Sequence, residues 1–297
     1  IRSYLDVNIP TSPSFSFTIQ SETAEEGYRR QLIHYTSLEG GMIPAFLLIP
    51  DGDGPFPAIL VHHQHNAERH LGKSEVVGLV GDPLQGIGPD LARNGIMVLA
   101  PDSICFEDRR RQRKGTEPDP NPEMDWLQHY NEMAYRLVHG TTLMKKVLED
   151  SAIGISILEG HPLVDEERIG MYGHSYGGNT TMFHAPLDTR IQFSCASGSV
   201  ATYQHKFDNE IGLELALVIP DFLQHFLTVD LIKEVAPRRI LIVSAADDRY
   251  SLDADHIVDQ ARSSFREAGV EDHLEHFRYK DGGGHPLTKE RYRDILA

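Results

Sequence analysis

The stretch RIGMYGHSYGGNTTM, residues 168–182, joins an apolar run to a serine between glycines and then to a segment without a helix breaker. The first five residues alternate and are rich in strand formers, and no helix breaker follows Asn179 until Pro186. Gly173 and Gly177 can take backbone angles closed to other residues and leave room for two elements to cross closely. The stretch therefore predicts a strand, a sharp turn at Ser175 and a helix.

The residues GHSYG match the pattern G-x-S-x-G of the nucleophile elbow, in which a tight turn pushes the serine side chain out above a sheet. The pattern alone also fits a small polar residue in an ordinary turn. The predicted strand before it and the predicted helix after it favour the elbow. We therefore interpret Ser175 as a candidate nucleophile, which needs a base, an acid and oxyanion donors from elsewhere in the chain.

Strands and helices alternate on both sides of this stretch. Short apolar runs predict buried strands at 57–62, 96–100, 191–196 and 239–245. Alternating patterns predict further strands at 14–20, 29–38, 42–49 and 274–279. Helical patterns span 88–94, 131–159, 255–268 and 288–296. This order predicts one α/β domain over residues 1–297, a mostly parallel sheet with helices on both faces and antiparallel N-terminal strands.

Two segments fit the alternation poorly. Residues 103–130 are rich in proline and charge, and residues 200–235 separate two predicted strands. They are lid or cap elements over a site, or plain surface insertions.

Composition excludes several classes of protein. Of the 297 residues, 24% are charged and 40% hydrophobic, and the net charge of −16 argues against nucleic acid or an anionic membrane as a partner. Cys105 and Cys195 lie in or beside apolar stretches, which predicts buried free thiols. No apolar stretch has the length of a membrane span, and no signal-peptide pattern occurs, so we expect a cytoplasmic location. Nothing in the sequence indicates a homo-oligomer.

The candidate base and acid follow the two last predicted strands. Proteins with this elbow place the serine, the acid and the histidine in that order along the chain. Strand 239–245 is followed by Asp247 and Asp248, and strand 274–279 by a glycine-rich loop that ends at His285. The first aspartate of such a turn commonly caps it through a local hydrogen bond. We therefore assign His285 as the base and Asp248 as the acid, with Asp247 as the alternative.

Several stretches together resemble one family. They are PFPAILVHHQH, GPDLARNGIMVLAPDSICFEDR, LVDEERIGMYGHSYGGN, ILIVSAADDRYS and DGGGHP. In this order they cover roughly residues 55–290 and resemble the α/β-hydrolases, in the dienelactone-hydrolase-like and acetyl-xylan-esterase-like branch. The resemblance implies the α/β-hydrolase fold, a Ser-His-Asp site that cleaves esters or related acyl compounds, and no cofactor. It also places the acid at Asp248.

The oxyanion donors are expected from the backbone N–H groups of Tyr176, directly after the nucleophile, and of Gln64, in the loop after the first buried strand. This loop departs from the family pattern, because His62 and His63 stand where many relatives have His-Gly. The nucleophile position holds a serine and not the cysteine of the dienelactone hydrolases themselves, so their specific substrate is not implied.

The histidine cluster His62, His63, His65 and His70 suggests a metal site as an alternative. Its spacing matches no standard metal motif, and only Glu68 is placed to complete a ligand set. We therefore expect no metal, and expect these histidines to shape the loop through hydrogen bonds.

The sequence thus predicts a serine hydrolase of the carboxylesterase type that acts on a small-molecule ester. One alternative is a peptidase or amidase of the prolyl-oligopeptidase type, although the chain lacks a propeller-sized N-terminal region. The other is a catalytically silent hydrolase fold used for binding, although such proteins usually lose members of the triad.

Overall fold

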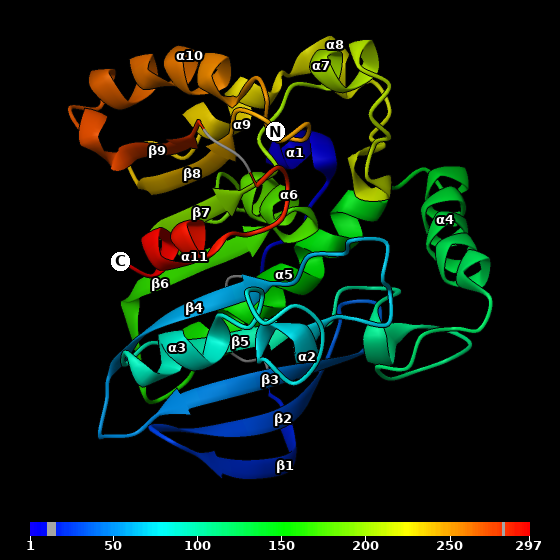
Figure 1. The fold of residues 1–297 in the computed structure, drawn as a ribbon, viewed down its shortest axis with the longest axis vertical. Coiled ribbons are helices and arrows are strands. Elements are labelled where there is room, and N and C mark those ends of the chain that lie inside the picture. Colours follow the sequence, from blue (N-terminus) through cyan, green and yellow to red (C-terminus); the bar gives the residue numbers. More distant parts are fainter. Residues whose placement is uncertain (11–15, 281–282) are drawn as a thin grey trace.

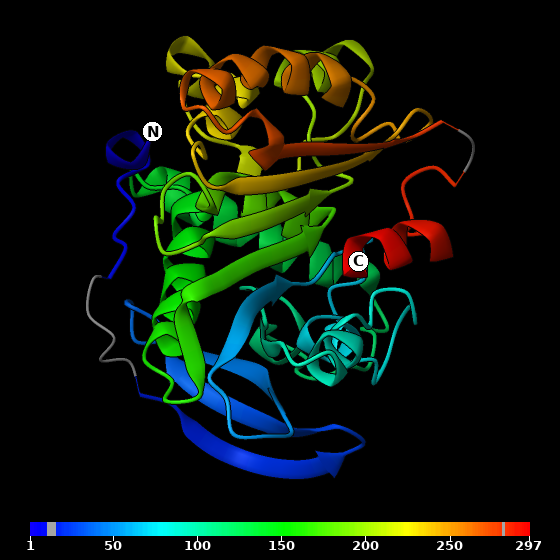
Figure 2. The same ribbon diagram turned by 90° about the vertical axis from the view of Figure 1, so that its left-hand side faces the viewer.

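A computed structural model of the chain describes residues 1–10, 16–280 and 283–297, and nine strands in these residues form one sheet. The strand order across the sheet is β1-β2-β3-β5-β4-β6-β7-β8-β9. The strands are β1 Thr18–Glu25, β2 Tyr28–Thr36, β3 Met42–Pro50, β4 Phe56–His62, β5 Met97–Pro101, β6 Val164–His174, β7 Phe193–Ser197, β8 Arg239–Ala245 and β9 Leu274–Tyr279. Figure 2 shows the sheet twisting from the orange β9 at one edge to the blue β1 at the other.

The pairing of the strands agrees with the predicted mostly parallel sheet. β1, β2, β3 and β5 pair antiparallel, and every pair from β5 through β4 to β9 is parallel. The central strand β4 is buried along most of its length because helices cover both faces, whereas β1 at the edge is exposed and polar. This arrangement brings the carboxyl ends of β4, β6, β7, β8 and β9 to one side of the molecule.

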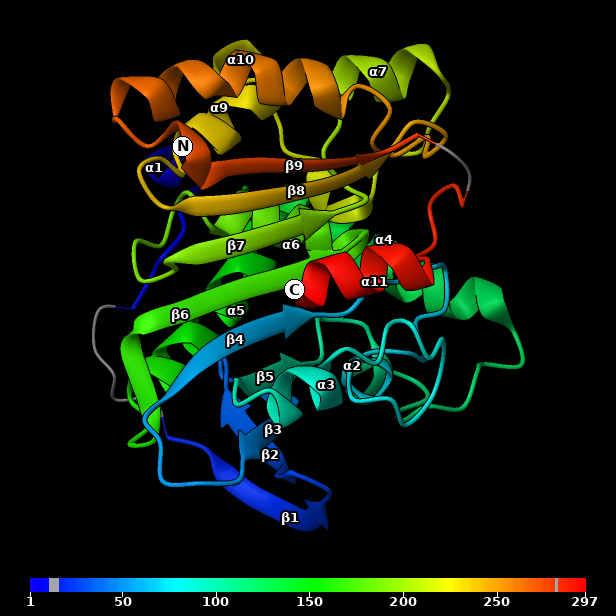
Figure 3. The ribbon, with the colours of Figure 1, turned by 60° about the vertical axis from the view of Figure 1, so that its left-hand side comes forward.

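Two layers of helices cover the sheet (Figures 1 and 3). One face packs against α5, α6 and α10, and the other against α2, α3 and α11. The helices and short 3-10 turns are α1 Arg2–Leu5, α2 Lys73–Val76, α3 Gly88–Arg93, η1 Glu107–Arg109, α4 Pro122–Val138, α5 Leu143–Glu159, α6 Tyr176–His184, α7 Tyr203–Asp208, η2 Leu215–Leu217, α8 Phe222–His225, α9 Thr228–Lys233, α10 Ala254–Glu267, η3 Glu271–His273 and α11 Lys289–Leu296.

The single helix predicted over 131–159 is wrong. Two helices, α4 and α5, occupy this part of the chain. Gly140 ends the first of them with a positive φ of 72°, and the Thr142 side chain accepts a hydrogen bond from the Lys145 N–H at 3.0 Å to begin the second. The break was missed because a lone glycine inside a helical pattern is often tolerated, whereas here it is followed by a capping threonine.

The boundaries of the other elements lie close to their predictions, and β8 and β9 coincide with them. The largest shift is at the first strand, because β1 runs to Glu25 and not to residue 20. Residues 14 and 15 of that prediction lie outside the described residues.

Both segments that fitted the alternation poorly contain helical structure. Residues 103–130 hold η1 and the first half of α4, and residues 200–235 hold α7, η2, α8 and α9. Part of the second segment borders the cavity described below. Among the described helices, none has both the length and the hydropathy that a membrane crossing requires.

Candidate active site

The nucleophile elbow is formed by the end of β6, Ser175 and the start of α6. Ser175 takes a strained backbone conformation, with φ 56° and ψ −114°, and its N–H donates to the Ser197 carbonyl at 2.8 Å. Gly173 and Gly177 are needed here because they lack a side chain and not because they adopt unusual backbone angles, since neither has a positive φ. A methyl group on Gly173 would lie 2.2 Å from the Gly177 carbonyl carbon, and one on Gly177 would lie 2.3 Å from the His62 carbonyl oxygen. Strand and helix can therefore cross closely only if both residues are glycine.

Ser175, His285 and Asp248 form one hydrogen-bonded chain. The Nε2 atom of His285 lies 2.7 Å from the Ser175 hydroxyl oxygen, and its Nδ1 atom lies 3.1 Å from a carboxylate oxygen of Asp248. The three side chains come from the ends of β6 and β8 and from the loop after β9. The geometry is that of a base between a nucleophile and an orienting acid.

The Asp248 carboxylate is buried, being 1% exposed, yet it stays ionised. Burial alone would raise the pKa of Asp248, but the hydrogen bond and charge of His285 lower it. The Tyr250 N–H at 3.0 Å and the Ser251 hydroxyl at 2.7 Å also donate to this carboxylate. The net result is a pKa below the ordinary value of aspartate, so Asp248 can orient His285 as an anion.

Asp247 lies outside this chain of hydrogen bonds. It is exposed, and its carboxylate accepts the Gly284 N–H at 3.1 Å. Arg291 of α11 holds the same loop through the carbonyls of Gly284 and Pro286, at 2.8 and 3.0 Å. Asp247 therefore caps the loop that carries His285, while Asp248 contacts the imidazole itself.

Two aromatic rings hold the His285 imidazole from its sides. The His174 ring stacks on it with centroids 5.0 Å apart and planes at 29°, and the Tyr250 ring lies 4.5 Å away at 56°. Burial lowers the pKa of His174 to about 3, so its ring is neutral. Gly198 fits beneath both imidazoles, because a methyl group there would lie 2.7 Å from His174 and 3.3 Å from His285. Sequence reasoning missed these supports, because ring contacts between distant segments leave no local pattern.

The two predicted oxyanion residues are placed differently. Tyr176 is the first residue of α6, where a backbone N–H has no partner inside the helix, and it lines the cavity beside Ser175. Gln64 is buried and does not line this cavity, and its side chain donates to Glu75 at 3.3 Å. The next residue, His65, does line the cavity. Tyr176 and His65 therefore line the cavity beside the nucleophile, and the role of the Gln64 backbone N–H stays a prediction.

Ser175 opens on a cavity of about 430 Å³. It is lined by His65, Asn66, Ala67, Ser175, Tyr176, Asn179, Gly198, Ser199, Lys206, Gly212, Leu213, Glu214, Tyr250, His285 and Pro286. Lys206 and Glu214 belong to the segment that the sequence predicted as a lid or an insertion, where no motif marked them as site residues. The cavity lies at the carboxyl ends of the parallel strands, where ligands bind in open α/β sheets.

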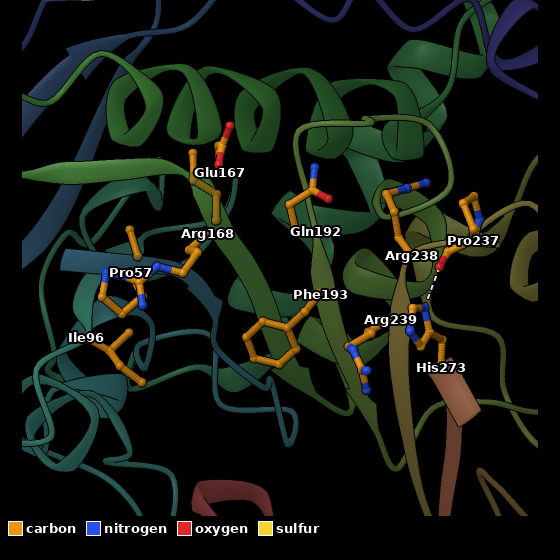
Figure 4. Close-up of a pocket in the computed structure, with 12 residues that line it drawn as sticks. Pro57, Ile96, Glu167, Arg168, Gln192, Phe193, Pro237, Arg238, Arg239 and His273 are labelled. Atoms are coloured by element: carbon orange, nitrogen blue, oxygen red, sulfur yellow. Dashed lines mark hydrogen bonds between the residues drawn. The ribbon is translucent and has the colours of Figure 1, made fainter. Parts of the chain in front are cut away.

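A second cavity, of about 490 Å³, lies at the opposite ends of the strands (Figure 4). Phe193, Arg239 and Pro57 line it at the starts of β7, β8 and β4. Among the described residues that line it there is no serine or cysteine. The candidate serine nucleophile therefore lies at the first cavity and not at this one.

The loop histidines have separate hydrogen-bond partners and do not converge on one point. His63 donates from Nδ1 to the Gln64 carbonyl at 2.6 Å and accepts the Ser103 N–H at 3.1 Å, so it ties the loop after β4 to the loop after β5. His62 bonds to Ser151 at 2.8 Å, inside the core. The contacts of His63 therefore shape the loop, whereas His62 is bonded to a core helix.

Within the described residues, one group of ligand-type side chains is close enough together to hold an ion: Asp102, Glu107 and Asp108. The Lys73 ammonium already binds all three, at 2.9 Å from Asp102 and 2.6 Å from Asp108, and it contacts Glu107 as well. This cluster is an ion-pair network that ties α2 to the start of the 103–130 segment.

The fold and parts of the sequence match known proteins. The sequence model of the acetyl xylan esterase (AXE1) family matches residues 105–216. YtaP of Bacillus subtilis (strain 168), named as a hydrolase, is 26% identical over 211 residues, which make up 69% of this chain and 65% of YtaP.

Two solved structures share the fold over nearly the whole chain. A protein of Bacteroides fragilis NCTC 9343, described as an acetyl xylan esterase, superposes with a TM-score of 0.75 at 18% identity, covering 98% of this chain and 78% of its own. Acetyl xylan esterase 1 of Thermoanaerobacterium sp. JW/SL YS485 gives 0.65 at 17% identity, covering 99% and 89%. The chain has the α/β-hydrolase fold, and its sequence resembles the acetyl-xylan-esterase-like branch, as predicted.

Proposed function

We propose that the protein is a serine hydrolase that cleaves carboxylic esters of small molecules through an acyl-enzyme on Ser175. The observation that carries the proposal is the chain of hydrogen bonds from Asp248 through His285 to Ser175, which ends at an open cavity. The similarity to esterases supports the reaction class.

The first half of the reaction forms the acyl-enzyme. His285 Nε2 takes the Ser175 proton while the serine oxygen attacks the ester carbonyl carbon, and the Asp248 anion stabilises the imidazolium that results. The N–H of Tyr176 donates to the oxyanion, and a second donor comes from the loop after β4. When the tetrahedral intermediate collapses, the bond to the alcohol breaks and His285 returns the proton to the leaving oxygen.

The second half releases the acid. A water molecule gives its proton to His285 Nε2 as its oxygen attacks the acyl carbon, and the second tetrahedral intermediate collapses with the Ser175 oxygen as the leaving group. The imidazolium then returns the proton to Ser175, which restores the free enzyme.

Short acyl groups fit this site better than long lipid-like ones. Asn179 and Lys206, both buried, and Glu214 stand among the residues that line the cavity, and a long hydrocarbon chain would remove water from them without giving them hydrogen bonds. We also expect the protein to act in the cytoplasm, which fractionation of the source cells would test.

A series of p-nitrophenyl esters from two to twelve carbons tests this function. We expect turnover with a maximum among the shortest acyl groups and its loss in Ser175→Ala. A maximum at ten carbons or longer would contradict the short-chain specificity, and turnover that survives Ser175→Ala would contradict the assigned nucleophile. A matching series of p-nitroanilides separates an esterase from an amidase.

A further inference from the structure

Several polar atoms around the candidate active-site cavity have no hydrogen-bond partner among the described residues. They are Oε1 of Glu214, Oδ1 of Asn179 and Oγ of Ser199, and all three are buried from solvent. Leaving a buried polar group unpaired costs free energy, so native proteins rarely keep such groups together without a reason. Their common position on the cavity that contains Ser175 indicates that a bound molecule completes their hydrogen bonds.

Lys206 of α7 adds a positive charge to this set. It is only 4% exposed, and within the described residues its ammonium makes no hydrogen bond or ion pair. Burial lowers the pKa of Lys206 more than the attraction of Glu214, Asp253 and Asp248 raises it. Within the described residues this amine therefore has no direct partner, and its burial penalises the charged form.

Glu214 is fixed by its backbone contact and offers one free oxygen. Its Oε2 accepts the Ala216 N–H at 2.8 Å, which caps η2, and its Oε1 is the atom without a partner. Burial raises the pKa of Glu214 to about 7. Lys206 and Glu214 both line the cavity and yet do not form an ion pair, so the fold holds a donor and an acceptor apart.

We propose that Lys206 and Glu214 determine specificity by binding a neutral, hydroxyl-bearing part of the ester substrate, with Lys206 donating to a hydroxyl oxygen and Glu214 accepting a hydroxyl proton. A hydroxyl group is both a donor and an acceptor, so a pair of neighbouring hydroxyls serves both residues. A carboxylate would satisfy Lys206, but it has no hydroxyl proton to donate to Glu214 and would be repelled by Asp248 nearby. This inference rests on the proposed esterase function and names the substrate class of the same site.

Acetate esters that differ only in the alcohol test the proposal. We expect kcat/KM for glycerol monoacetate to exceed that for propyl acetate by roughly 10- to 100-fold, because propyl acetate leaves both Lys206 and Glu214 without a hydrogen-bond partner. An ester that carries a carboxylate, 3-acetoxypropanoate, should be poorer than glycerol monoacetate. Equal rates for the first two esters, or a preference for the third, would overturn the proposal.

Two variants assign the effect to these residues. Lys206→Met removes the ammonium, and Glu214→Gln keeps the cap of Ala216 while turning an NH2 donor toward the cavity in place of the free acceptor. Each should lower kcat/KM for glycerol monoacetate by about tenfold or more relative to kcat/KM for p-nitrophenyl acetate. Equal losses on both esters would contradict a role in specificity.

The thermal stability of Lys206→Met and two control variants separate a role in specificity from a structural role. Because its unpaired charge is buried, Lys206→Met should melt at the same temperature as the native protein or higher, and a lower Tm would show a structural lysine instead. The exposed residues Lys114 and Glu210 provide matched controls, Lys114→Met and Glu210→Gln, which should leave both esters unaffected. Loss of p-nitrophenyl acetate turnover in Ser175→Ala tests the esterase function separately, so a specificity failure in an active enzyme contradicts this proposal alone.

Discussion

Among the described residues, serine, histidine and aspartate lie together at Ser175, at Ser151 and at Ser244, and of these three serines only Ser175 lines the active-site cavity. In the core, the Ser151 hydroxyl lies 2.8 Å from His184 Nδ1, and His184 Nε2 lies 3.4 Å from Asp188. All three residues are at most 2% exposed. At the cavity, His285 faces Ser175 with Nε2 and Asp248 with Nδ1, which is the opposite orientation of the ring.

The difference teaches that residue types and distances do not by themselves make a catalytic site. The Ser151 hydroxyl is also bonded to His62 at 2.8 Å, so its hydrogen bonds lie within the core, and no substrate reaches it. Ser175 sits on a strained turn at the start of a helix, beside backbone N–H groups and a cavity. Access and oxyanion donors therefore separate the two serines.

Replacing the two serines gives the largest expected contrast. Ser175→Ala should lower kcat by roughly 10⁴-fold or more, since only binding and the oxyanion donors remain. Ser151→Ala should keep activity near the native level and lower the free energy of unfolding by about 1–3 kcal/mol, because two buried imidazoles lose a partner. Ester kinetics and urea unfolding of both variants measure these two effects. An inactive but stable Ser151→Ala variant would contradict a purely structural role for Ser151.

The two neighbouring aspartates give the next contrast. Asp248→Asn should cost roughly 10⁴-fold in kcat, because an amide can donate where the Nδ1–H of His285 also needs to donate. Asp247→Asn retains an oxygen for the Gly284 N–H and should stay within about tenfold of the native rate. Equal losses of kcat in the two variants would contradict the assignment of Asp248 as the orienting acid.

Asp188 affects stability and not the reaction. Burial would raise its pKa, but hydrogen bonds from Arg190, at 2.6 and 2.8 Å, and the nearby His184 imidazole hold the pKa well below the ordinary value. A lowered pKa in the folded state means that the stabilisation is complete above about pH 4 and is lost as the pH falls further. Asp188→Asn should therefore lose roughly 3 kcal/mol at pH 7, with a difference from the native protein that shrinks below pH 4. Urea unfolding at several pH values checks this, and a constant difference would contradict it.

Gln64→Ala should have the smallest effect on kcat of these substitutions. Its side chain points to Glu75 and the backbone N–H survives, so we expect kcat to fall by less than about tenfold. A fall beyond about a hundredfold at unchanged thermal stability would mean that the Gln64 side chain takes part in the reaction.

The sequence predicted the parts of the site that follow from local patterns. Ser175 stands out because strand, glycines and helix adjoin it, and His285 and Asp248 because each follows a buried strand. The contributions of Lys206 and Glu214 depend on how a long segment folds back over the sheet, and no spacing encodes that. His65 was named only as a loop histidine because the path of the loop after β4 is set by contacts with Ser103 and Glu75, which lie elsewhere in the chain.

Labelling with a fluorophosphonate probe, followed by peptide mass spectrometry, tests the central claim most directly. The probe reacts with a serine that is both activated by a base and accessible. The structure predicts one labelled peptide, which carries the adduct on Ser175, with Ser151 unmodified in the folded protein. A label on Ser151 or another serine, or no label in a protein that hydrolyses p-nitrophenyl acetate, would contradict the assignment of Ser175 as the nucleophile.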